Sequence, residues 1–71
     1  MQRYRVDVRS TRMTGFRINV AAESREAAEE EALRIARRTA RETNAENGAN
    51  TYPTEIDAWR VERIRKIRGE R

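Results

Sequence analysis

The side chains that could do chemistry in this chain are few in kind, and arginine dominates them. The 71 residues include no histidine and no cysteine, and fifteen of the sixteen basic residues are arginine. The usual general base, thiolate nucleophile and soft metal ligands are therefore absent. The only serines, Ser10 and Ser24, have no histidine to activate them. We expect no enzyme activity, no cofactor and no metal, and a protein that works by binding.

Carboxylates are plentiful, but their positions favour a structural role. Glu29, Glu30 and Glu31 are consecutive and fall near the start of a predicted helix. Acidic side chains stabilise a helix at that end, whereas catalytic carboxylates need a pocket that shifts their pKa. A chain of 71 residues has little room for such a pocket. Glu30 and Arg34 are four residues apart, which predicts an ion pair on the helix surface.

The abundance of arginine points to anionic partners. Its guanidinium group makes paired hydrogen bonds to phosphate and carboxylate, and the net charge of the chain is +4. A GC-rich coding sequence would produce the same bias without any functional meaning. The charge is segregated: residues 1–22, 34–42 and 58–71 are net positive, and residues 23–33 and 43–57 are net negative.

Three segments alternate between apolar and charged residues. Residues 4–8 and 16–20 carry an apolar side chain at every second position, which is typical of strands with one buried face. The polar residues 10–15 between them predict a β-hairpin. A third strand is predicted to open at Ile56. After Glu62 its alternation slips to Ile64 and Ile67, which indicates either a β-bulge or a frayed basic tail over residues 63–71.

A helix is predicted between the second and third strands. Residues 25 to about 42 are rich in alanine, glutamate and arginine, and Ser24 is well placed to cap the first turn. Residues 43–54 contain three asparagines, a glycine and a proline, which predicts a long loop. Tyr52, within this loop, either pins the loop to the helix end or projects as an anchor for a partner.

These elements predict a single α+β domain over residues 1–71. The simplest arrangement is a three-stranded antiparallel sheet in the order 2-1-3, with the helix packed on one face. The predicted core comprises Tyr4, Val6, Val8, Phe16, Ile18, Val20, Trp59 and Val61 beneath Ala28, Ala32, Ile35 and Ala36.

The opposite face of this sheet is the candidate binding surface. Arg5, Arg9, Arg17 and Arg60 alternate with the core residues, and Arg3 lies nearby. Such a face could bind nucleic-acid phosphates, an acidic protein surface, or only solvent, as a charged guard against aggregation. Tyr4, Phe16 and Trp59 fall on the buried side, which weighs against single-strand binding by base stacking. The candidate binding residues are Arg3, Arg5, Arg9, Arg17, Arg60, Arg63, Arg65, Lys66 and Tyr52.

The order of segments resembles small phage and plasmid proteins of the DpnD/PcfM-like type. The resemblance rests on residues 4–8, 16–22, 23–30 and 59–61, which follow a strand, strand, A-E-S-x-E-E-A helix, strand layout. It implies an accessory protein of a mobile element. By analogy with anti-CRISPR proteins, we expect an inhibitor that binds a host protein or ribonucleoprotein complex.

Two alternatives remain open beside the inhibitor. One is direct binding of nucleic acid by the arginine-lined face. The other is a structural homodimer, in place of a monomer, paired through the edge of the third strand together with Ile64 and Ile67. The N-terminal segment is charged from its start, and no apolar run reaches membrane-spanning length. We therefore expect a cytoplasmic location and no membrane partner.

Overall fold

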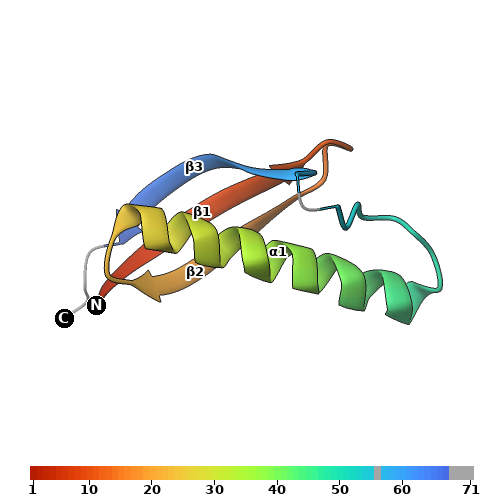
Figure 1. The fold of residues 1–71 in the computed structure, drawn as a ribbon, viewed down its shortest axis with the longest axis horizontal. Helices are drawn as coiled ribbons and strands as arrows, with labels where there is room; N and C mark the ends of the chain where they lie inside the picture. The colour runs from red at the N-terminus through yellow and green to blue at the C-terminus, as the bar shows by residue number, and fades with distance from the viewer. Residues whose placement is uncertain (56, 68–71) are drawn as a thin grey trace.

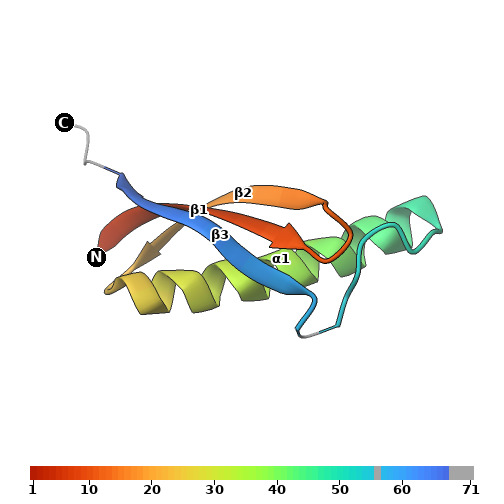
Figure 2. The same cartoon turned by 90° about the horizontal axis from the view of Figure 1, so that it is seen from above.

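The elements form two layers, a three-stranded sheet and one helix that covers it. A computed structural model describes residues 1–55 and 57–67. The strands pair antiparallel in the order β2-β1-β3, and Figures 1 and 2 show the helix lying along one face of the sheet. The predicted α+β fold and strand order are confirmed. The elements are β1 (Gln2–Ser10), β2 (Gly15–Ala22), α1 (Arg25–Asn47) and β3 (Trp59–Ile67).

The core lies between α1 and the face of the sheet that it covers. The α1 residues that are fully buried against the sheet are four alanines spaced four apart. Such small side chains let the helix lie close to β1, whose Val6 and Val8 are also buried. The predicted core is confirmed, although Phe16, Ile18, Ile35 and Val61 are only partly buried at its margins. The four alanines are Ala28, Ala32, Ala36 and Ala40.

The helix is longer than the sequence indicated. Its start is as expected, because the Ser24 hydroxyl accepts a hydrogen bond from the Ala27 backbone N–H at 3.1 Å. It ends at Asn47 and not near residue 42, so the predicted loop over 43–54 is wrong in its first five residues. Gly48 stops the helix by taking the left-handed conformation, with φ of 65°.

The segment that follows α1, described at residues 48–55 and 57–58, is a shorter loop that is tied to both layers. The Asn44 side chain, still on the helix, accepts a hydrogen bond from the Tyr52 N–H and donates one to the Tyr52 carbonyl. The Tyr52 ring lies 5.4 Å from the Phe16 ring. Tyr52 therefore pins the loop to the helix end, which is the first of its two predicted roles.

The third strand begins later than predicted. It starts at Trp59, because the Ala58 N–H turns back to the Glu55 carbonyl and the Ala58 carbonyl accepts from Thr11 in the hairpin turn. Ile56, where the strand was expected to open, lies outside the described residues.

One ion pair on α1 makes the stability of the fold depend on pH. Arg34 pairs with Glu31, three residues earlier, and not with Glu30 as predicted. The hydrogen bond from Arg34 lowers the pKa of Glu31 below its ordinary value. The pair therefore stabilises the fold above the pKa of an unfolded glutamate, and this contribution is lost as the pH falls through the lower, folded pKa.

We expect the substitution Arg34→Gln to raise the pKa of Glu31 back toward its ordinary value. An NMR titration of the Glu31 carboxyl carbon measures this change. Arg41→Gln removes an exposed arginine two turns further along α1 and should leave the Glu31 titration nearly unchanged. An ordinary pKa for Glu31 in the unsubstituted protein would contradict the ion pair.

Candidate functional site

The face of the sheet that α1 leaves uncovered gathers seven arginines from three strands. Cross-strand partners share a face, and the register pairs Arg5 with Asn19 and Arg65, and Arg9 with Gly15 and Arg60. We call this surface the arginine face. Its arginines are Arg3, Arg5 and Arg9 from β1, Arg17 from β2, and Arg60, Arg63 and Arg65 from β3.

A bulge in β3 determines which side chains reach this face. Val61 pairs with Val8 and Arg63 pairs with Asp7, so Glu62 is an extra residue with no partner on β1. In a regular strand Arg63 would have followed Val61 onto the helix side. The extra residue instead turns Arg63 and Arg65 outward and Ile64 inward. The predicted bulge is confirmed, and β3 continues as a paired strand to Ile67. Residues 68–71 of the predicted tail lie outside the described residues.

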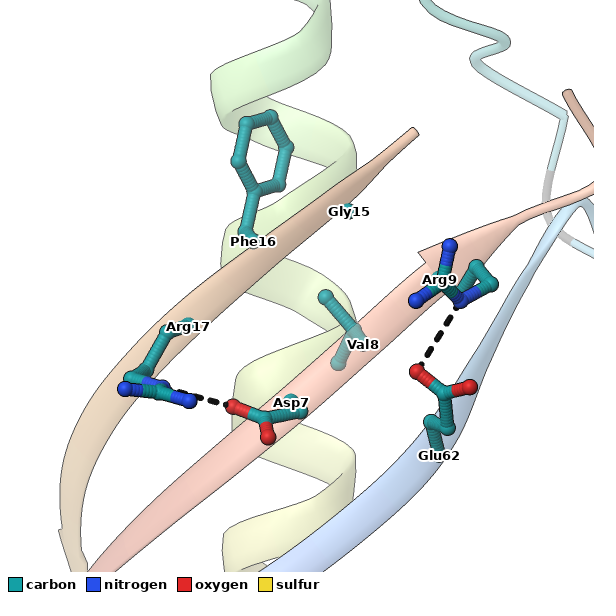
Figure 3. A pocket seen from close by; sticks show the side chains of 7 residues that line it. All are labelled: Asp7, Val8, Arg9, Gly15, Phe16, Arg17 and Glu62. Carbon is teal, nitrogen blue, oxygen red and sulfur yellow. Dashed lines mark hydrogen bonds and ion pairs between the residues drawn. The ribbon is translucent and has the colours of Figure 1, made fainter. Parts of the chain in front are cut away.

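Two of the seven arginines are engaged by carboxylates. Arg17 donates from Nε to Asp7 at 3.0 Å, and Arg9 donates from Nε to Glu62 at 2.9 Å. Figure 3 shows both pairs on the side of the sheet away from α1. Among the described residues, the other five make no ion pair. With seven arginines against Asp7 and Glu62, the face has a net charge of about +5 at neutral pH.

Like charges also lie directly opposite each other on this face. Arg5 is the partner of Arg65, and Arg9 is the partner of Arg60. Directly opposed like charges destabilise a sheet, although Glu62 partly offsets this for Arg9. The arrangement is therefore unfavourable for folding, and an anion between the guanidinium groups would offset this repulsion.

Two depressions mark the arginine face. A shallow groove of about 450 Å³ lies at the hairpin end, where Gly15 leaves the sheet backbone bare between Arg9 and Arg17. A Cβ atom at Gly15 would lie 2.8 Å from the Val8 carbonyl oxygen, so a larger residue does not fit there. A smaller and more enclosed recess of about 100 Å³ lies further along the strands. Arg5, Asp7, Arg17, Arg63 and Arg65 line the recess.

Not every predicted binding residue belongs to this face. Lys66 is the partner of Tyr4 and therefore projects toward the helix side of the sheet. Tyr52 is half-buried in the loop that packs beside Phe16. The structure brings together the seven predicted arginines and separates Lys66 and Tyr52 from them. Asp7 and Glu62, which orient two of the arginines, were not among the predicted site residues.

The two serines use their hydroxyl groups in turns. Ser10 is almost fully buried, and its hydroxyl accepts hydrogen bonds from the backbone of Arg12 and Thr14 while also bonding to the Thr14 side chain. Ser24 caps α1. Within residues 1–55 and 57–67, no group of three acidic side chains is arranged to hold a metal ion. The same part of the chain contains no helix that is both long enough and apolar enough to cross a membrane.

Comparisons with known proteins leave the family open. No family model matches the chain, and neither curated proteins nor solved structures give a significant match. The DpnD/PcfM-like resemblance therefore stays a prediction from the sequence.

Proposed function

We propose that this protein is a non-enzymatic nucleic-acid-binding protein that uses its arginine face to hold the phosphate backbone. The observation that carries the proposal is the convergence, on one uncovered surface, of five arginines from two strands that make no ion pair within residues 1–55 and 57–67. Arginine side chains on one face supply the sequence-independent part of nucleic-acid affinity. The strands of nine residues span about 30 Å, which is the rise of roughly nine nucleotides of a duplex strand.

The composition of the face favours phosphate over an acidic protein surface. Stable protein interfaces centre on buried apolar and aromatic anchors, with charges at the rim. Here the centre of the face is charged, and its apolar side chains, Ala21 and Ile67, lie beside Arg3 at one end. A phosphate backbone requires cations and no apolar anchor. Inhibition of a host complex therefore remains a prediction from the resemblance. The charge of the arginine face gives more support to direct binding of nucleic acid.

Duplex nucleic acid fits this face better than a single strand. Single-strand binders stack bases on exposed aromatic rings. Each aromatic residue in the described part of the chain lies on the helix side, where Tyr4 and Trp59 are buried and Phe16 and Tyr52 are half-buried. The arginine face therefore offers no aromatic ring on which a base could stack. We expect recognition of the backbone without sequence preference.

The homodimer alternative receives less support from the geometry. It requires a second copy to pair with the free edge of β3. That edge carries the bulge at Glu62 and a dense row of charged side chains, both of which oppose strand pairing. Ile64, one of its two proposed contacts, packs against the core.

The proposal predicts binding that depends steeply on salt. A fluorescently labelled 20-base-pair duplex should bind with micromolar or tighter affinity at about 50 mM salt. With five phosphate contacts, the slope of log Kd against log salt should be about 4 to 5. Fluorescence anisotropy over a salt series measures both quantities. The triple variant Arg3→Gln, Arg60→Gln, Arg65→Gln should lower the slope by about 3.

A matched control separates the arginine face from net charge. Arg25, Arg38 and Arg41 are exposed on α1, and replacing all three by glutamine removes the same charge from the other layer. We expect this control to keep most of the salt slope. Equal losses in the two triple variants, or no duplex binding at low salt, would overturn the proposal. Stoichiometric capture of an acidic protein without nucleic-acid binding would favour the protein-partner alternative.

A further inference from the structure

The small recess on the arginine face brings several guanidinium groups around one space. Five residues line its volume of about 100 Å³, and four of them are arginines. The fifth, Asp7, is already held by Arg17 through a hydrogen bond of 3.0 Å. The guanidinium groups of Arg5, Arg63 and Arg65 make no ion pair with any described carboxylate. The four arginines and Asp7 together give the recess a net charge of about +3 at neutral pH.

Arg5 also has a donor without an acceptor. Its Nε atom is buried and has no hydrogen-bond partner among the described residues. A buried N–H without a partner is unfavourable. Because this atom has almost no exposed surface, an anion in the recess would contact the other donors of the Arg5 guanidinium group. The cross-strand partner Arg65 adds a second guanidinium group to the same space, and an anion between the two would offset their repulsion.

The charge of the recess selects among phosphate groups. At about 100 Å³ the recess has room for a few water molecules, and therefore for one small anion such as a phosphate group. A phosphodiester within a strand has one negative charge and two free oxygens. A phosphate monoester has up to two charges and three free oxygens, which three unpaired guanidinium groups can all engage.

We propose that the recess binds a phosphate monoester, such as the phosphorylated end of a nucleic-acid strand. This inference rests on the proposed function and adds a preference to it. The rest of the arginine face, including Arg3 and Arg60, would contact the backbone that leads away from that end. The protein would then bind ends that carry a phosphate in preference to ends that carry a hydroxyl.

The test compares two duplexes of identical sequence, one with 5′-phosphate and one with 5′-hydroxyl ends. We expect the unsubstituted protein to bind the phosphorylated duplex about tenfold more tightly. The double variant Arg63→Gln, Arg65→Gln should lose this preference. The double variant Arg3→Gln, Arg60→Gln removes the same charge outside the recess and should keep the preference while binding both duplexes more weakly. Circular dichroism establishes that each variant is folded.

Inorganic phosphate provides a second readout that needs no nucleic acid. Titration with phosphate, followed by NMR, should shift the Nε–H signals of Arg5, Arg63 and Arg65 more than that of Arg60. Equal affinity for the two duplexes would contradict phosphate binding in the recess but not nucleic-acid binding by the arginine face. The same holds if the Arg63→Gln, Arg65→Gln variant keeps the preference for the phosphorylated duplex. Phosphate binding in the recess without binding of either duplex overturns the nucleic-acid face instead.

Discussion

Replacing Trp59 with alanine should remove most of the folding free energy of this protein. Trp59 is only 5% exposed, and its ring stacks on Phe16 with centroids 5.2 Å apart. Truncating a buried tryptophan typically costs about 3–5 kcal/mol. The core of a domain of this size rarely supplies more than about 3–5 kcal/mol in total. We therefore expect a largely unfolded chain at 25 °C, measured by circular dichroism and urea denaturation.

The variant Trp59→Phe tests how the tryptophan acts. It keeps an aromatic ring beside Phe16 but removes the hydrogen bond of 2.8 Å from Nε1 to the Pro53 carbonyl. We expect a folded protein that is less stable by about 1–2 kcal/mol. Met13→Ala, at a side chain that is 73% exposed, should change stability by less than about 0.5 kcal/mol. A fully stable Trp59→Ala variant would contradict the stacking of Trp59 on Phe16 and its hydrogen bond to Pro53.

Reversing the charge at Arg65 should strengthen the fold and weaken binding. Arg65 lies directly opposite Arg5, so Arg65→Glu replaces a like-charged pair with an opposite one. Such a change should raise stability by about 0.2–1 kcal/mol. It also replaces a favourable phosphate contact with a repulsive one, and we expect duplex affinity at low salt to fall by about tenfold or more. Urea denaturation and fluorescence anisotropy measure the two effects.

Arg41→Glu is the matched control for this reversal. Arg41 is exposed on α1, so its substitution makes the same change in net charge away from the arginine face. We expect a much smaller loss of affinity. If Arg65→Glu raises stability as expected but leaves duplex binding unchanged, then the arginine face is a solvated surface that serves only to keep the protein in solution.

Much of the fold follows from local patterns in the sequence. Alternation in residues 4–8 and 16–20 identifies the hairpin because each strand has one covered face. Ser24 marks the start of α1 through its hydroxyl. The slip from Val61 to Ile64 is readable as a bulge because it breaks the period of two. Since alternation separates core from surface, it also assigns Arg5, Arg9, Arg17 and Arg60 to one face.

The remaining features depend on contacts between distant residues. Asn44 was expected in a loop because asparagine favours turns. It lies in α1 instead, and its side chain forms two hydrogen bonds with the backbone of Tyr52. The face of Lys66 depends on its position beyond the bulge, which sets its pairing with Tyr4. The pairing of Arg9 with Glu62 joins residues 53 positions apart. Because these contacts join residues that are far apart in the sequence, no local pattern predicts them.

The separation of charge between the two layers has a kinetic consequence. The first three turns of α1 are rich in glutamate, and they cover the end of the sheet where β1 begins and β3 ends, which is the end that carries Arg3 and Arg65 (Figure 1). This arrangement gives that end of the molecule an electric dipole directed across its two layers. A polyanion would orient the molecule before contact, with the arginines leading and the glutamates trailing. Encounters would then be productive more often than random collisions, and added salt would slow association more than dissociation.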